Sequence, residues 1–456
     1  MTGIPDLLNS LSQIGKMDVD PYSGNLFTYV YETGDKKLRN IQHKALNMFY
    51  DRNALDFTTF KSAAYFEKEI IRFAKSISHA DENVLGTLTY GGTESILLAV
   101  KAARDLFRKK RGKDEVPEIV LPSSGHPSWE KGAEYFDLRL KIIPIDRKNK
   151  KANLESLKSA INERTALVVA SAPNFPYGSI DPVKEMGEIT RDKGVPLHVD
   201  ACVGGFILPF FERLGEDVPV YDFQEEGVSS LSMDTHKYGY SLKGSSVLLF
   251  RNPEMKKYSN YINISWPSYI FVNTSILSSR SVGPMASAWT AINYLGMEGY
   301  QSLAKKVLSA RNYLSKEMEK LGFRSTAPIE SSILSMYNDT IDLFGFVYGM
   351  QKRSWHLEIQ KAIQDLVPYN IHMTLSPVHN RLSKPFIKAA RDTITSPPDP
   401  RFMELMGGLS QGNLSDLMTM VKEGNINPAL LVKLLEQIPE DSAREMANEI
   451  VNEVFR

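Results

Sequence analysis

The sequence predicts an α/β fold in which a large domain with a mostly parallel sheet is followed by a smaller α+β domain. Between residues 51 and 300, short apolar segments that suit strands alternate with longer segments of helical periodicity. Polar or charged residues directly follow several of the apolar segments, as in sheets that bind ligands at the strand ends. The chain of 456 residues is 42% hydrophobic, which is enough to bury a sizeable core.

The large domain is predicted over residues 51–300, after an amino-terminal arm over residues 1–50 that carries few core-like patterns. Parallel strands need crossover connections, and helices in these crossovers would cover both faces of the sheet. The strand candidates are Ile119–Leu121, Lys141–Ile145, Leu167–Ala170, Leu197–Val199 and Val247–Phe250.

The smaller domain is predicted over residues 301–395. Leu303–Leu321 has the pattern of a long helix, and Ser331–Tyr337 suits a strand. The proline-rich run Ser396–Pro400 ends this domain, and a helical carboxy-terminal extension follows over residues 396–456. Its amphipathic segments suit packing on the protein itself or, alternatively, docking of a partner. They are Leu414–Met418, Pro428–Leu435 and Ala443–Phe455.

The run Asp234-Thr235-His236-Lys237 ends a probable strand and suggests covalent chemistry at an amine. A lysine that forms a Schiff base must be held rigidly, partly desolvated and available as the neutral amine. Gly239 and Gly244 follow, so a large cofactor could approach the backbone closely. Taken alone, Lys237 could equally be a surface lysine, so this interpretation depends on three further segments.

The first of these segments is Gly91-Gly92-Thr93-Glu94-Ser95, which reads as the start of a helix that continues over Ile96–Ala103. Backbone N–H groups at a helix N-terminus, with a hydroxyl beside them, form a ready site for a phosphate group. A capping turn without a ligand is the alternative for this segment by itself.

An aspartate and a histidine complete the set. Asp200 ends the apolar segment Pro196–Val199, and His126 lies in a turn just before a helix. An aspartate at a strand end can pair with the pyridinium nitrogen of pyridoxal 5′-phosphate (PLP) and keep it protonated. A histidine can stack on the ring and act near neutral pH. The chain order of phosphate-binding helix, His126, Asp200 and Lys237 therefore predicts a PLP site.

This order and the local motifs resemble the fold-type I (aspartate aminotransferase-like) PLP enzymes, and within them the group II PLP-dependent decarboxylase family. The resemblance runs from about Asn53 to about His372. Ser279-Arg280-Ser281 and Trp355 also fit the family pattern. The most specific segments are Gly91–Ser95, Ser171–Pro182, Asp234–Gly239 and Lys243–Ser246.

The resemblance implies a role for each residue of the site. Lys237 would be the Schiff-base lysine, Asp200 the partner of the pyridine nitrogen, and His126 the residue that stacks on the ring. The residues implied at the cofactor phosphate are Gly92, Thr93, His236 and, from a partner subunit, Ser279.

The family pattern also implies a homodimer with shared active sites. Tyr31 and Asn53 match an amino-terminal stretch that closes the site from the other subunit. Lys243 would contact the substrate phosphate or, alternatively, be only a second cation in the pocket. These three are the implied substrate-binding residues.

The implied activity is that of a carbon–carbon lyase, which cleaves the Cα–Cβ bond of phosphorylated long-chain bases to a fatty aldehyde and phosphoethanolamine. A decarboxylase of amino acids is the alternative, and a PLP-retaining protein without catalysis is the third reading. Asp56 and Tyr177 both stand where the lyase pattern has a histidine, and Ser278 replaces a glycine. An acid at position 56 would repel a phosphate monoester, so the substrate is less certain than the reaction.

Composition excludes several other classes of function. Lys plus Arg equals Asp plus Glu at 54 each, which argues against nucleic acid as a partner. The only cysteine, Cys202, excludes an internal disulfide, and it suits a small buried side chain better than a catalytic thiol. The eight histidines lack metal-binding spacing, so no metal is predicted. Neither a signal peptide nor a long apolar run is visible, which predicts a cytoplasmic protein without a transmembrane segment.

Overall fold

The computed structural model describes residues 4–410, 432–433, 436 and 438–455. The chain divides into two compact units. This division does not test the domain boundaries expected from the sequence, which remain a prediction. The larger unit comprises residues 35–311 and 325–335, and the smaller unit comprises residues 1–34, 312–324 and 336–456.

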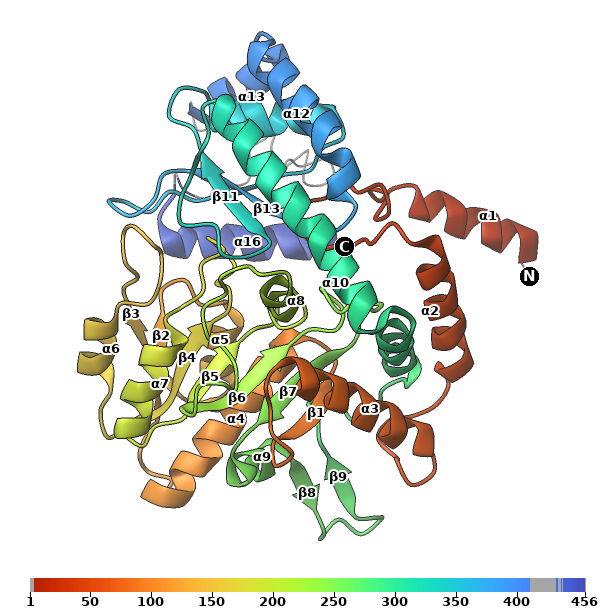
Figure 1. Ribbon diagram of the computed structural model, residues 1–456, viewed down its shortest axis with the longest axis vertical. Coiled ribbons are helices and arrows are strands. Elements are labelled where there is room, and N and C mark those ends of the chain that lie inside the picture. The colour runs from red at the N-terminus through yellow and green to blue at the C-terminus, as the bar shows by residue number, and fades with distance from the viewer. Residues whose placement is uncertain (1–3, 411–431, 434–435, 437, 456) are drawn as a thin grey trace. The chain divides into compact units, whose positions relative to one another are not determined.

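A seven-stranded sheet forms the centre of the larger unit (Figure 1). Its strands are β1 Leu85–Thr89, β2 Glu118–Pro122, β3 Arg139–Ile143, β4 Thr165–Ser171, β5 Leu197–Asp200, β6 Val228–Met233 and β7 Ser246–Phe250. Their order is β1-β7-β6-β5-β4-β2-β3. All pairs from β3 to β6 are parallel, and β7 is antiparallel to both of its neighbours. The predicted mostly parallel sheet is therefore confirmed, and the five strand candidates coincide with β2, β3, β4, β5 and β7.

Helices flank this sheet and bury its strands. Every residue of β2, β4 and β7 is buried. Their sequences accordingly lack the polar–apolar alternation of a half-exposed strand. Helix α4 contributes Leu98 and Val100 to a hydrophobic cluster with Leu121, Leu167 and Phe250 of three strands. The helices are α2 Lys36–Phe49, α3 Lys61–Ile77, α4 Gly92–Arg111, α5 Ser128–Phe136, α6 Leu154–Ala160, α7 Val183–Asp192, α8 Leu208–Arg213 and α9 Pro253–Ser259.

Two further features of the chain follow β7. Strands β8 Tyr261–Asn263 and β9 Phe271–Asn273 form a hairpin that projects from the larger unit (Figure 1). Helix α10, Gly283–Lys320, contains the predicted helix Leu303–Leu321. A non-helical conformation at Gly296, with φ 54° and ψ −175°, divides α10 into two helices across a kink.

The smaller unit has its own hydrophobic core. Phe27 stacks on His379 with the ring centroids 4.3 Å apart, and Trp355 packs edge-on against Phe386. Strand β12 pairs antiparallel with β13, and the four-stranded sheet has the order β10-β11-β13-β12. The remaining elements of the chain are α1 Ile4–Gly15, β10 Arg324–Ser325, β11 Ile333–Tyr337, α11 Leu343–Lys352, β12 Glu358–Gln360, β13 Asn370–Thr374, α12 His379–Thr395, α13 Pro400–Ser410 and α16 Glu440–Val454.

The structure describes nearly all of the amino-terminal arm but only part of the carboxy-terminal extension. Residues 1–50 contain two helices, α1 and α2, that the sequence analysis did not predict. The predicted strand Ser331–Tyr337 and helix Ala443–Phe455 coincide with β11 and α16. The segments 414–418 and 428–435 lie wholly or mostly outside the described residues. Among the residues that the structure describes, no helix is long and apolar enough to cross a membrane.

Candidate active site

The glycine-rich start of α4 lies directly against the segment that carries Lys237. A Cβ atom added at Gly92 would lie 2.9 Å from Oδ2 of Asp234 and 2.9 Å from Sγ of Cys202. One added at Gly91 would lie 3.2 Å from Cε1 of His236. A side chain at position 92 would force these groups apart, whereas one at position 91 would require a smaller shift of His236. The structure thus brings together three segments that the sequence analysis singled out separately.

Hydroxyl groups surround this helix start. Thr93, whose side chain is exposed, shares a hydrogen bond of 2.9 Å with Oγ of Ser128, at the start of α5. Ser95 is buried and lies 2.7 Å from Oγ1 of Thr89 and 3.1 Å from Oγ of Ser246. The N-terminus of α4 therefore combines exposed backbone donors with a fixed hydroxyl, as a phosphate site requires.

Lys237 is held by an aspartate three residues before it. Its Nζ lies 2.9 Å from Oδ2 of Asp234, and Oδ1 of the same buried carboxyl accepts a hydrogen bond of 2.6 Å from Ser246. Burial acts to raise the pKa of Asp234, but the charges of Lys237 and His236 and the hydrogen bond from Ser246 lower it overall. The sequence analysis quoted Asp234 without giving it a role, although its spacing to Lys237 suits a contact within one turn.

Asp200 occupies the carboxyl end of β5, as the sequence predicts. Its Oδ2 accepts a hydrogen bond of 3.3 Å from Nε1 of Trp129, and its Oδ1 accepts one of 3.1 Å from the backbone N–H of Cys202. The side chain is buried. Two donors on two different elements therefore fix the direction of this carboxylate. Trp129 is a positioning residue that the sequence analysis missed, since nothing local in the sequence connects it with β5.

His126 lies in the turn before α5 with its side chain exposed to solvent. Its Nδ1 accepts a hydrogen bond of 3.2 Å from the backbone N–H of Ser128. Desolvation by the surrounding protein lowers the pKa of His126, the charge of Asp200 opposes this shift, and the charge of Lys237 adds to it. His126 is therefore a neutral ring at pH 7, within electrostatic reach of both residues.

Ser279 and Asn53 lie together at another place on the larger unit. Nδ2 of Asn53 donates a hydrogen bond of 3.2 Å to Oγ of Ser279, and Oδ1 of Asn53 accepts one of 3.3 Å from the backbone N–H of Arg280. Asn53 also forms an isolated β-bridge with Ser281. The structure thus joins two residues that the family pattern assigns to one function. Tyr31 belongs to the smaller unit, and its role stays a prediction.

The two altered positions have defined local surroundings. The exposed carboxylate of Asp56 accepts hydrogen bonds from the hydroxyls of Thr58 and Thr59, at 2.6 and 2.7 Å, and from both of their backbone N–H groups. The bond from the Thr58 hydroxyl contributes most to lowering the pKa of Asp56 to about 2. Tyr177 is buried, and its backbone N–H donates to Oδ1 of Asn174. Asp56 is thus an ionised residue that caps its own turn.

Comparisons with known proteins give this site its context. Residues 66–329 match the pyridoxal-dependent decarboxylase conserved domain. The chain belongs to the pyridoxal-dependent decarboxylase family. It is 33% identical to a sphingosine-1-phosphate lyase of Oryza sativa subsp. japonica, over 85% of this chain and 72% of that protein. It is also 33% identical to sphingosine-1-phosphate lyase 1 of Rattus norvegicus, over 86% of this chain and 68% of that protein.

Solved structures agree. The sphingosine-1-phosphate lyase of Burkholderia pseudomallei K96243 superimposes with a TM-score of 0.82 at 28% identity, over 91% of this chain and 96% of that chain. Glutamate decarboxylase of Lactobacillus brevis superimposes with a TM-score of 0.76 at 20% identity, over 86% and 93% of the two chains, which shows the shared fold. This member of the decarboxylase family is therefore a PLP-dependent carbon–carbon lyase of fold-type I.

The residues of this family member fit the cofactor. Within the part of the chain that the structure describes, three buried polar atoms near the helix start and the His126 turn lack a hydrogen-bond partner: Nδ1 of His236, Oγ of Ser124 and Oγ of Ser245. Buried polar groups are nearly always satisfied, so a polar ligand is expected there. Lys243 adds a cation, and desolvation, reinforced by the charge of Lys237, lowers its pKa. No group of three or more potential metal ligands occurs among the described residues.

Proposed function

We propose that this protein cleaves the Cα–Cβ bond of phosphorylated long-chain bases, with sphingosine 1-phosphate as the representative substrate. The products would be a fatty aldehyde and phosphoethanolamine. The observation that carries this proposal is the joint placement of Lys237 on buried Asp234 and against the glycine-rich start of α4. Similarity to sphingosine-1-phosphate lyases over 85% of the chain supports the choice of bond.

Each residue of the site would have its own role in the reaction. PLP, when bound, supplies an electron sink for the charge left by the breaking bond. Asp200, directed by Trp129 and the backbone of Cys202, would hold the proton at the pyridine nitrogen. Lys237 would attach the cofactor through Nζ, and Asp234 would keep that amine in place before and after the substrate displaces it.

The remaining residues would bind rather than react. Gly92, Thr93 and His236 would hold the cofactor phosphate, and the neutral ring of His126 would stack on the cofactor. Lys243 would contact the substrate phosphate, as the family pattern implies, because a lysine ammonium donates strong hydrogen bonds to a phosphate. Cleavage in the lyase direction also requires a base for the substrate hydroxyl, whereas decarboxylation does not.

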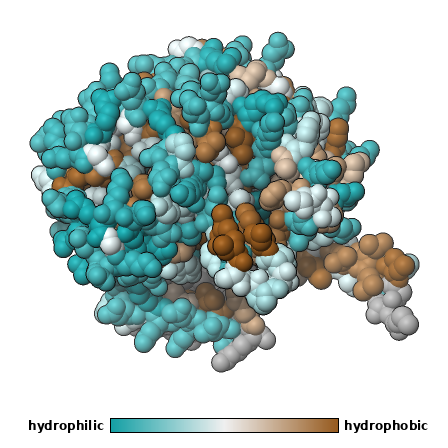
Figure 2. Space-filling view, turned by 90° about the horizontal axis from the view of Figure 1, so that it is seen from below, coloured by the Kyte–Doolittle hydropathy of each residue, from teal (hydrophilic) through white to brown (hydrophobic). Residues whose placement is uncertain are grey.

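A homodimer is part of the proposal, because Ser279, Asn53 and Tyr31 would act on the partner's site. The hairpin β8–β9 supports it: Tyr261–Asn273 contains no charged residue, and Ile262, Ile264 and Ile270 are 59, 78 and 67% exposed. Figure 2, seen from the side on which this hairpin projects in Figure 1, shows an apolar patch on a largely hydrophilic face. A second copy would cover such a surface. A cytoplasmic location stays a prediction.

One observation favours the alternative, an amino acid decarboxylase. Asp56 is exposed and its pKa is about 2, so its charge is present throughout the pH range of an assay. If Asp56 lies near the substrate phosphate, it opposes binding of that group, whereas an amino acid without a phosphate avoids this repulsion.

A paired assay on PLP-loaded protein tests the two reactions. One arm measures long-chain aldehyde released from sphingosine 1-phosphate, and the other measures CO2 released from a mixture of amino acids. We expect aldehyde from the wild type and none from Lys237→Ala. Release of CO2 without aldehyde would move the protein to the decarboxylases and make Asp56 a specificity residue.

A further inference from the structure

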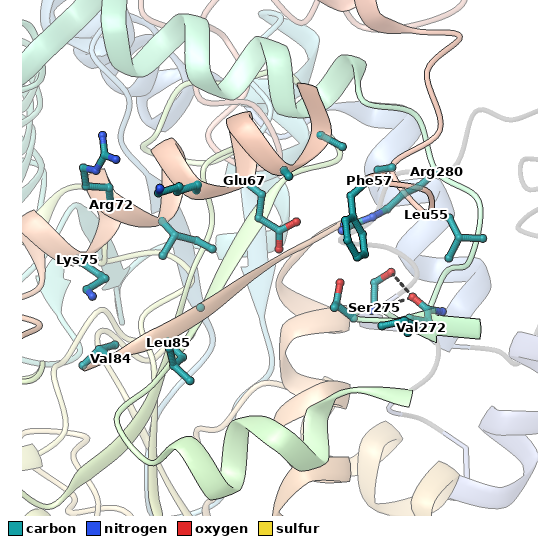
Figure 3. A pocket seen from close by; sticks show the side chains of 18 of the residues that line it. Leu55, Phe57, Glu67, Arg72, Lys75, Val84, Leu85, Val272, Ser275 and Arg280 are labelled. Atoms are coloured by element: carbon teal, nitrogen blue, oxygen red, sulfur yellow. Dashed lines mark hydrogen bonds between the residues drawn. The ribbon is translucent and has the colours of Figure 1, made fainter. Parts of the chain in front are cut away.

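A pocket of about 520 Å³ lies between α3, the start of β1 and the segment 272–280 (Figure 3). Its volume falls in the range of about 300–1,000 Å³ that is usual for small-molecule sites. None of the residues proposed to hold PLP lines it. The residues that line the pocket are therefore distinct from those proposed to hold the cofactor.

The walls of the pocket are mostly apolar. Leu55, Phe57, Ile71, Leu85 and Val272 contribute aliphatic and aromatic surface. Phe57 and Leu85 are 48% and 44% exposed, so apolar area here remains in contact with water. Burial of such area by a ligand is favourable in proportion to the area removed from water.

The polar side chains of the pocket are already engaged by the protein. Oε1 of Glu67, at the centre of Figure 3, accepts hydrogen bonds of 3.0 Å from Oγ1 of Thr87 and 2.8 Å from the backbone N–H of Leu88. Nζ of Lys75 donates to the carbonyl oxygen of Glu82 at 2.9 Å. Glu67 and Lys75 are therefore already satisfied by the protein, and the apolar walls remain open to a ligand.

Cationic side chains lie at both ends of the pocket. Arg280 lies at one end beside Leu55 and Phe57, whereas Lys75 and Val84 lie at the opposite end (Figure 3). Nη1 of Arg280 donates to the carbonyl oxygen of Leu88 at 2.9 Å, and a guanidinium has further donors that can bind a phosphate. Four cationic and two acidic side chains line the pocket as a whole, namely Lys68, Arg72, Lys75 and Arg280 with Glu67 and Glu82.

The pocket is also long. Its wall on α3 runs from Ala63 to Lys75, a span of about 18 Å at the rise of an α-helix. A channel of this length with apolar walls and cations at both ends matches a single alkyl chain.

We propose that this pocket binds the alkyl chain of a long-chain phosphorylated amphiphile and so sets the preference for chain length. The choice of ligand class rests on the proposed function. Arg280 follows Ser279 in the chain, and Ala54, next to Asn53, also lines the pocket. The chain site thus adjoins Asn53 and Ser279, the two residues that are proposed to act on the partner's active site.

Binding of alkyl phosphates to the PLP-loaded protein tests this proposal without requiring turnover. Titration calorimetry compares a series from butyl to dodecyl phosphate. If the chain enters the pocket, affinity rises by roughly fourfold for each buried methylene. Ala64 lines the pocket but is exposed, so Ala64→Phe fills the space without disturbing the core. We expect this variant to lose the gain in affinity for the longer chains.

Ser76→Phe is the matched control, because Ser76 is an exposed residue of the same helix outside the pocket. It should bind the series as the wild type does. If Ala64→Phe binds dodecyl phosphate as tightly as the wild type, the chain lies elsewhere and the inference is wrong. The aldehyde assay distinguishes this inference from the lyase proposal. If affinity rises with chain length in the wild type but not in Ala64→Phe, and no aldehyde is released from sphingosine 1-phosphate, this inference holds and the lyase proposal is wrong.

Discussion

Glu94, in the first turn of α4, accepts a hydrogen bond of 2.6 Å from the backbone N–H of Ile276. The same carboxylate oxygen accepts a second bond of 3.1 Å from the backbone N–H of Leu277. Glu94 is buried. One carboxylate thus connects the glycine-rich helix start with the segment that carries Ser279, although 182 residues separate the two in the chain.

Replacement of Glu94 should destabilise both the start of α4 and the segment that carries Ser279. Each hydrogen bond to a charged group contributes about 1.5–3 kcal/mol, so the loss of two such bonds in Glu94→Ala should lower the free energy of unfolding by about 3–6 kcal/mol. The variant should also bind PLP more weakly. Chemical denaturation and PLP titration measure the two effects. Glu130→Ala, at an exposed position in the first turn of α5, should change neither. Unaltered PLP affinity in Glu94→Ala would contradict the coupling.

Removal of Lys237 should leave Asp234 as a buried carboxylate without its cation. Breaking a buried pair in this way costs about 3–5 kcal/mol, and this loss should appear in the free energy of unfolding of the PLP-free Lys237→Ala protein. The double variant Lys237→Ala/Asp234→Asn should recover most of it, because the uncompensated charge is gone. Equal stability of the single and double variants would mean that Asp234 does not depend on Lys237.

The pH dependence of this loss has a defined sign. The pKa of Asp234 is lowered in the folded wild type, so its contribution is present above the unfolded value of about 3.9 and disappears as the pH falls through the folded value. In Lys237→Ala the pKa of Asp234 rises. The difference between wild type and variant should therefore be largest near neutral pH and shrink in acid.

Mixed dimers test whether Ser279 acts across the subunit interface. Lys237→Ala and Ser279→Asp chains are each expected to be inactive alone, since an acid at position 279 would repel the cofactor phosphate. In a mixed dimer with shared sites, one site combines an intact Lys237 with the intact Ser279 of the other chain. Activity should therefore return on mixing the two unfolded chains and refolding them together. If Ser279 served its own chain, every site would stay defective and mixing would restore nothing.

His198 should make the protein less stable in mild acid. The side chain is fully buried, with Nδ1 2.8 Å from Oγ of Ser230 and Nε2 3.1 Å from Oγ of Ser232. Burial lowers the pKa of His198 from 6.5 to about 4. Its contribution to stability is therefore complete above the unfolded value and is lost as the pH falls from 6.5 towards 4.

Denaturation at several pH values measures this effect. His198→Asn should reduce the slope of unfolding free energy against pH in that window by about one proton. His43→Asn, at an exposed position of α2, should leave the slope as it is. A wild-type slope in His198→Asn would show that other groups take up the proton.

Local patterns in the sequence were sufficient for the strands and for the order of the site motifs. The continuous apolar run of β4 predicts a strand covered on both faces, and β4 is buried at every residue. The glycine-rich run from Gly91 predicts the start of a helix, and α4 begins at Gly92. Helices α1 and α2 were missed. The apolar residues of α1 recur at helical spacing, a signal that the sequence analysis did not use. They are Ile4, Leu7, Leu8, Leu11 and Ile14, and all are exposed.

Contacts between distant segments could not be predicted in the same way. The bonds from Glu94 to Ile276 and from Trp129 to Asp200 join residues on different elements, and no local periodicity relates such pairs. The pocket between α3 and the segment 272–280 is likewise formed by segments that are distant in the sequence. Its walls come from three separate parts of the chain.

The sequence by itself determined the fold class, the cofactor and the chain order of the groups that would bind it, because strand periodicity, glycine placement and residue chemistry are local properties. Only the tertiary structure decided which groups hold these residues in position and which surface remains open to a long chain. Packing brings Asp234 to Lys237, Trp129 to Asp200 and Asn53 to Ser279. The direction of a carboxylate and the shape of a cavity depend on neighbours that only the folded chain supplies.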